Sequence, residues 1–224
     1  MTAWTRIAGW GVLADGSEVT WTVADGRKGR RWREVVTRGT AVIHALLLES
    51  DRERRFSHLE LARPDGLWTF HPELDGMLHG NHVGRGEMEV RHVVGWPFGS
   101  DHELIVEGSP VSLAALAWRR ASSVADGVAV DVAGVVIRLG GDLDQAATVR
   151  IERLSRMRWR VGEGDPFEVD DEGLPLLHDG ETRALELVPP AFGGKPVENA
   201  PPHPEVRPKL VDKSVSRPQG GRLS

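Results

Sequence analysis

The body of this chain alternates apolar and polar residues with a period of two, and this pattern constrains its fold more than any other feature. The clearest segment is residues 156–161, where Met157, Trp159 and Val161 alternate with three arginines. Successive side chains of a β-strand point to opposite faces of a sheet, so each such segment predicts a strand with one buried face. The same alternation occurs in residues 19–23, 90–94, 102–106 and 135–139.

Turn-forming residues separate these segments at short intervals. Asp-Gly pairs recur along the chain and favour tight hairpins, because glycine readily adopts positive φ. Turns this frequent predict roughly ten to twelve strands in meander order. Residues 40–49 (TAVIHALLLE) favour a central strand over a short buried helix, and only residues 109–120 (SPVSLAALAWRR) have the pattern of an amphipathic helix. The predicted fold class is all-β: a single antiparallel β-roll or barrel-like domain.

A change in composition near Val188 predicts the end of this domain. Residues 189–224 hold eight of the fourteen prolines and show no sustained periodicity. Such a segment cannot bury enough apolar surface to offset the entropy lost on ordering, so we expect a domain of residues 1–188 and a disordered C-terminal tail. The functional alternative is a scaffold protein whose tail recruits a partner through polyproline-type segments.

Charge and composition argue against several functional classes. The formal net charge is −5, and the first 188 residues are more acidic still, with 22 basic and 30 acidic side chains. So acidic a body disfavours binding to nucleic acid. No apolar run approaches the roughly 18–20 residues that span a bilayer, and no secretory signal is recognisable. Cysteine is absent, which excludes thiolate ligands and nucleophiles. We expect a cytoplasmic protein with no transmembrane segment.

Histidine and tryptophan are concentrated in residues 68–103, which makes this stretch the first candidate for a site. His92 and His102 occupy apolar-flanked positions of strand-like segments. Small-molecule sites are concave and mostly apolar, with a few placed polar groups, and a closed β-structure can enclose one. We therefore predict an internal cavity in which three tryptophans form apolar walls and two histidines bind the polar end of a ligand. The predicted residues are Trp68, His92, Trp96, His102 and Trp118.

A second interpretation of the histidines is a metal site. His71, His79 and His82 could supply three nitrogen ligands to a metal-dependent hydrolase or isomerase, although their spacing matches no specific metal motif. Histidines in such positions also occur as core or surface residues. A protein that is not an enzyme is favoured, with no cofactor and no catalytic residue predicted.

A short basic run is the other feature with a chemical interpretation. Five cationic residues surround Gly29 and Trp32, and these are Arg27, Lys28, Arg30, Arg31 and Arg33. They could clamp a phosphate, a carboxylate or a lipid headgroup. The preferred interpretation is a solvated hairpin turn, because the run begins at an Asp-Gly pair and lies on an acidic body.

Three segments carry a resemblance to a known family. They are residues 65–80 (DGLWTFHPELDGMLHG), 149–161 (VRIERLSRMRWRV) and 165–177 (DPFEVDDEGLPLL). Over residues 30–188 their order resembles the bacterial family described as glycolipid-binding, whose fold is a spiral β-roll. The resemblance implies a lipid-type ligand and transfers no specific binding residue. Together these observations favour non-catalytic binding of a small amphipathic, lipid- or glycolipid-like ligand.

Overall fold

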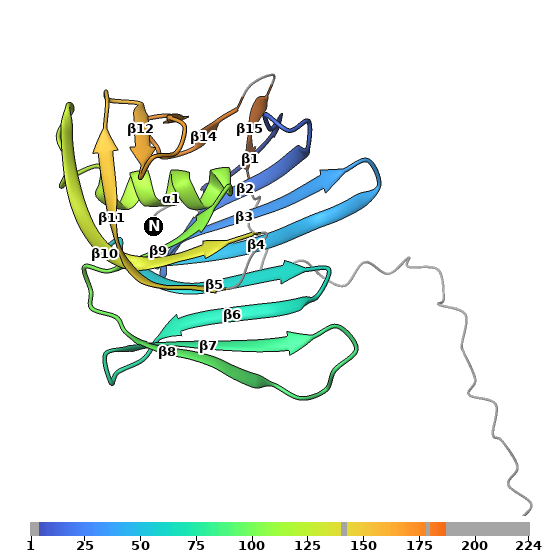
Figure 1. The fold of residues 1–224 in the computed structure, drawn as a ribbon. Helices are drawn as coiled ribbons and strands as arrows, with labels where there is room; N and C mark the ends of the chain where they lie inside the picture. The colour runs from blue at the N-terminus through green and yellow to red at the C-terminus, as the bar shows by residue number, and fades with distance from the viewer. Residues whose placement is uncertain (1–4, 140–142, 178–179, 187–224) are drawn as a thin grey trace, which may run out of the picture. The chain divides into compact units, whose positions relative to one another are not determined.

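The computed structural model describes residues 5–139, 143–177 and 180–186, all within a compact unit that spans Met1–Leu187. The predicted domain boundary and the predicted tail, residues 189–224, lie outside the described residues. The described part of the chain folds into fifteen strands and one helix, which confirms the all-β prediction (Figure 1). No helix in this part is long and apolar enough to cross a membrane.

The first sheet is a nine-stranded antiparallel meander in the order β15-β1-β2-β3-β4-β5-β6-β7-β8. Short hairpins connect β1 to β8 in sequence, and the last strand returns to pair with the first, as in a curled roll (Figure 1). The strands are β1 (Thr5–Val12), β2 (Glu18–Gly26), β3 (Gly29–Arg38), β4 (Ala41–Asp51), β5 (Phe56–Arg63), β6 (Gly66–Pro72), β7 (Met77–Gly84), β8 (Arg91–Pro97) and β15 (Glu181–Glu186).

The second sheet has six strands in the order β14-β13-β12-β11-β10-β9. Its strands are β9 (Glu103–Glu107), β10 (Val128–Arg138), β11 (Leu143–Arg153), β12 (Arg158–Val161), β13 (Phe167–Val169) and β14 (Pro175–Leu176). The pair β9 and β10 is parallel, which departs from a purely antiparallel roll. Parallel neighbours need a crossover connection, and the helix α1 (Pro110–Arg120) supplies it.

The helix forms where its pattern predicts it. Ser109 is the N-cap, and its hydroxyl accepts a hydrogen bond from the N–H of Ser112 at 2.9 Å. Pro110 occupies the first turn, where a missing N–H costs nothing. Arg119 and Arg120 lie in the last turn, where positive charge is favourable. The helix lies between the two sheets and contacts β3 of the first sheet and β9, β13 and β14 of the second (Figure 1).

Side chains fill the interior between the two sheets and the helix. In the first sheet, residues that point inward define an inner face, which includes the fully buried Trp32, Leu48, Leu59, Phe70 and Leu78. They pack with Leu104 and Val106 of β9, Val111 and Ala115 of α1, and Val135 and Ile137 of β10. A second cluster around Trp159 and Ile151 covers the other side of the helix. Alternate residues of the first sheet form an outer face that is half-buried or exposed.

Candidate functional site

The two histidines predicted to share a ligand cavity lie in different places. His92 of β8 is exposed on the outer face, with Nδ1 3.4 Å from Oδ1 of Asn81. His102 is half-buried just before β9, where its Nδ1 accepts the backbone N–H of Gly99 and its ring lies 5.5 Å from that of Phe98. The hollows that they line are separate. The two histidines therefore do not line one shared hollow in the described structure.

A β-bulge explains why His92 faces outward. In the pairing of β7 with β8, Asn81 lies opposite His92, and its neighbour Gly80 lies opposite Val94, two residues further on. The extra residue reverses the alternation along β8. Trp96 therefore pairs with Leu78 and packs against the core, although it has the same parity as His92.

The three predicted tryptophans all pack against the core rather than around a void. Trp68 is stacked on His82 with ring centroids 4.1 Å apart, and Trp96 is half-buried on the same side of the sheet. Trp118 meets Trp32 edge-on at 5.2 Å, and the guanidinium groups of Arg30 and Arg54 lie 4.6 and 4.4 Å from its ring centroid. Cation–π contacts of this kind hold the indole in place.

The three histidines of the alternative metal site do not converge. His71 and His79 face each other across β6 and β7 on the outer face, whereas His82 belongs to the inner face beside Trp68. No bulge interrupts β7 between His79 and His82 in its pairing with β6, so their difference in parity is preserved. The described residues contain no group of three His, Cys, Asp or Glu side chains that could hold a metal ion.

Two outer-face histidines pair with acids instead. His71 Nε2 lies 3.0 Å from Oε1 of Glu73, and His79 Nε2 lies 3.1 Å from Oδ2 of Asp75. The backbone N–H of Met77, and then His79, hold the pKa of the Asp75 carboxyl below its ordinary value. The two histidines, their acidic partners and His92 line an open hollow of about 350 Å³. It has the composition of a polar surface, with no apolar wall apart from the exposed Leu74.

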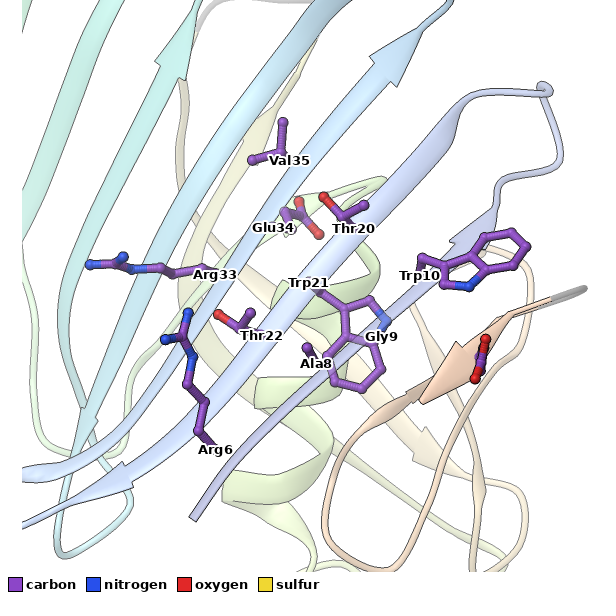
Figure 2. A pocket seen from close by; sticks show the side chains of 11 residues that line it. Arg6, Ala8, Gly9, Trp10, Thr20, Trp21, Thr22, Arg33, Glu34 and Val35 are labelled. Carbon is purple, nitrogen blue, oxygen red and sulfur yellow. The ribbon is translucent and has the colours of Figure 1, made fainter. Parts of the chain in front are cut away.

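A groove on the outer face of β1, β2 and β3 has a different character. Its volume is about 510 Å³, and Figure 2 shows Arg6 and Arg33 on one side of it and Trp10 on the other, with Thr22 between them. Strand register explains the gathering. Trp10 pairs with Thr20, which pairs with Val35, while Ala8 pairs with Thr22, which pairs with Arg33. The small side chains at the centre of these rows form the floor.

The basic end of the groove carries two cations without an internal partner. Within the described part of the chain, the guanidinium groups of Arg6 and Arg33 make no ion pair and no hydrogen bond. The Thr22 hydroxyl lies beside them (Figure 2). Glu181 lines the opposite end, across from Trp10. The two guanidinium groups therefore attract an anion to the Arg6–Arg33 end of the groove.

The apolar end depends on an exposed tryptophan. Trp10 is 43% exposed and Val35 36%. Trp10 points outward because it alternates with Gly9 and Gly11, which face the inner side. A Cβ at Gly9 would overlap the Trp21 ring, and one at Gly11 would lie 2.5 Å from Cβ of Leu177. Glycine is thus required on the packed side of β1, while the bulky indole is placed on the open side.

The sequence contained only part of the signal for this groove. The alternation that buries Val19, Trp21 and Val23 places Thr20 and Thr22 on the opposite face, and Arg33 belongs to the basic run. No local pattern connects these residues to Arg6 and Trp10. They meet because β1 and β3 both pair with β2.

Comparisons with known proteins add little to this geometry. No family model and no curated protein sequence matches the chain. The chain is similar to the crystal structure of a DUF1089 family protein from Pseudomonas aeruginosa, with 17% sequence identity and a TM-score of 0.39. The aligned region covers 78% of this chain and 88% of that one. A likeness at this level carries no argument about activity, so the function must be argued from the residues themselves.

Proposed function

We propose that this protein binds, without catalysis, a small amphipathic molecule with an anionic end in the outer groove of β1, β2 and β3. One observation carries the proposal: two guanidinium groups with no ion-pair partner among the described residues lie at one end of the groove, and an exposed indole lies at the other. This retains the ligand class expected from the sequence and moves the site from the interior to the sheet surface. The lipid-type ligand implied by the family resemblance agrees with it.

Each end of the groove suits one part of such a ligand. Arginine presents a planar fork of donors that matches a carboxylate or phosphate, and hydrogen bonds with ionised partners contribute about 1.5–3 kcal/mol each. The Thr22 hydroxyl offers a further donor. Apolar surface buried against Trp10 and Val35 contributes about 25 cal/mol per Å², so about 100 Å² would add about 2.5 kcal/mol.

Isothermal titration calorimetry with two ligands of equal chain length tests the proposal. Decanoate carries the anionic end, and decyl glucoside is its neutral counterpart. We expect decanoate to bind more tightly. Arg6→Gln and Arg33→Gln should each weaken decanoate binding about tenfold, the equivalent of about 1.4 kcal/mol. Trp10→Ser should weaken the binding of both ligands.

Arg85→Gln provides the matched control, because Arg85 is an exposed arginine after β7, far along the sheet from the groove. It removes the same charge and should leave the affinity unchanged. Equal affinities for decanoate and decyl glucoside would contradict the anionic end. An affinity that survives both arginine substitutions and Trp10→Ser would contradict the groove.

A further inference from the structure

A second pocket forms where the ends of two hairpins meet. The β2–β3 turn and the β4–β5 turn lie side by side because Gly29 approaches the backbone of β4. Gly29 has φ +140°, and a Cβ there would overlap the carbonyl oxygen of Ser50. Arg52 Nε also donates to the carbonyl of Arg27 and ties one turn to the other. The pocket has a volume of about 600 Å³.

Every acidic side chain that lines this pocket is already paired with an arginine. The pairs are Asp25 with Arg30 at 2.6 Å, Glu49 with Arg31 at 2.5 Å between Oε1 and Nε, and Asp51 with Arg55 at 2.7 Å. These acids are neutralised by their partners, so they do not compensate any further positive charge in the lining.

Two cations of the lining remain uncompensated. Arg27 and Lys28 form the exposed two-residue tip of the β2–β3 hairpin, and their side chains make no ion pair with any described residue. Two hydroxyls also line the pocket, those of Ser50 and Ser57. Ser50 is 2% exposed, and its Oγ is buried without a hydrogen-bond partner in the described structure. Buried hydroxyl groups normally have a hydrogen-bond partner, so this one is available to a polar ligand or to water.

We propose that this pocket binds a phosphate monoester. Such a group carries about −1.5 to −2 charge at neutral pH and three acceptor oxygens. Lys28 offers a point charge, Arg27 a fork of donors, and the serines offer hydroxyl donors. The pocket exceeds the size of one phosphate, so the organic part of the ester has room beside it. The basic run that the sequence singled out then has a binding role, independent of the groove at Trp10.

Two variants of equal charge test the proposal on the full chain. The double substitution Arg27→Gln with Lys28→Gln removes two positive charges from the pocket, and Arg85→Gln with Arg158→Gln removes two from exposed positions outside both the pocket and the groove. Calorimetry with phenyl phosphate should show at least a tenfold loss of affinity in the first variant and less than a twofold change in the second. Ser50→Ala should weaken phenyl phosphate binding about threefold or more.

A second probe distinguishes the source of the phosphate. Phosphatidylcholine vesicles that contain phosphatidic acid present the same group as a lipid headgroup, and sedimentation measures retention of the protein. Binding to either probe that is lost only in the Arg27/Lys28 variant supports the site, and the probe that binds identifies the source. Equal losses in the two double variants, or no binding of either probe by the natural chain, would overturn the proposal.

Discussion

His44 Nε2 lies 2.8 Å from Oε1 of Glu34, and both side chains are buried beneath the first sheet. The other carboxylate oxygen of Glu34 accepts the backbone N–H of Val111 at 3.2 Å. A single carboxylate therefore connects β3, β4 and the first turn of α1. That turn contains no acidic residue of its own, so Glu34 supplies the negative charge that a helix N-terminus favours.

The first prediction concerns this carboxylate. Glu34→Ala leaves His44 and the Val111 N–H buried without their partner, and breaking a buried pair of this kind costs about 3–5 kcal/mol. We expect the free energy of unfolding, measured by urea denaturation, to fall by about 3 kcal/mol. Glu18→Ala on the exposed side of β2 is the control and should change stability by less than about 0.5 kcal/mol. Similar losses of unfolding free energy in the two variants would show that the contacts of Glu34 with β4 and α1 do not stabilise the fold.

The second prediction concerns the other buried acid. Glu103 accepts hydrogen bonds from Nε of Arg119 and Nε of Arg120, both at 2.7 Å, and it joins β9 to the end of α1. Glu103→Leu leaves the buried Arg119 without its carboxylate partner and should lower the unfolding free energy by about 3 kcal/mol.

Replacing both members with apolar residues tests the reason for that loss. A hydrophobic pair of similar volume is often neutral or stabilising relative to a buried ion pair. Glu103→Leu with Arg119→Leu should therefore recover more than half of the stability lost in the single variant, as measured by the same denaturation experiment. A double variant less stable than Glu103→Leu alone would show that the unpaired charge of Arg119 is not the cause of the lost stability.

Features governed by local sequence were predictable. The helical pattern of residues 109–120 became α1 with Ser109 as its cap, and residues 40–49 became most of β4. Features that depend on a partner element were not. The alternation in β9 distinguishes Glu103 from its apolar neighbours, yet Glu103 is 3% exposed, because the crossover helix brings Arg119 and Arg120 to it.

The candidate site shows the same division. Local alternation separates Thr20 and Thr22 from the buried residues of β2, and so indicates part of the floor of the groove. It cannot predict the strand pairings that add Arg6 and Trp10. Local alternation also cannot reveal the bulge in β8 opposite Gly80 and Asn81. A bulge depends on how two strands pair, and it reverses which face the later side chains of the strand occupy.

The third prediction is a pH dependence at Asp75. Its pKa lies below the ordinary value of 3.8, chiefly because the carboxylate accepts the backbone N–H of Met77 and next because it pairs with His79. A lowered pKa in the folded state stabilises the fold above the unfolded pKa, and this contribution is lost as pH falls through the lowered value. Asp75→Asn should therefore be less stable than the natural chain at pH 6, with the difference vanishing towards pH 2.

Carbon NMR of the Asp75 carboxyl separates its two causes. In His79→Gln the titration of Asp75 should move only part of the way back towards 3.8, because the larger cause, the Met77 N–H, remains. Complete recovery of the ordinary pKa in that variant would show that His79, and not the Met77 N–H, is the larger cause of the lowered pKa. A difference in stability between Asp75→Asn and the natural chain that stays constant from pH 6 to pH 2 would contradict the linkage.

The fourth prediction compares two glycines with the same backbone conformation. Gly173 has φ +77° and Gly127 has φ +75°, so an alanine at either position adopts the left-handed region at a cost of about 1–2 kcal/mol. A Cβ at Gly127 meets nothing within 4 Å, whereas a Cβ at Gly173 lies 2.5 Å from Cβ of Trp118. Trp118 cannot easily yield, because Trp32 and two arginines enclose its ring.

Gly173→Ala should thus add an overpacking cost of about 1–3 kcal/mol to the backbone cost, for a total of about 3 kcal/mol, against about 1 kcal/mol for Gly127→Ala. Urea denaturation of both variants measures the difference, and near-ultraviolet circular dichroism reports whether the tryptophan surroundings change in Gly173→Ala alone. Equal stabilities would mean that the turn at Gly173 moves away from the helix without penalty. In that case Trp118 would be held by its contacts with Trp32, Arg30 and Arg54 rather than by the closing turn of the second sheet.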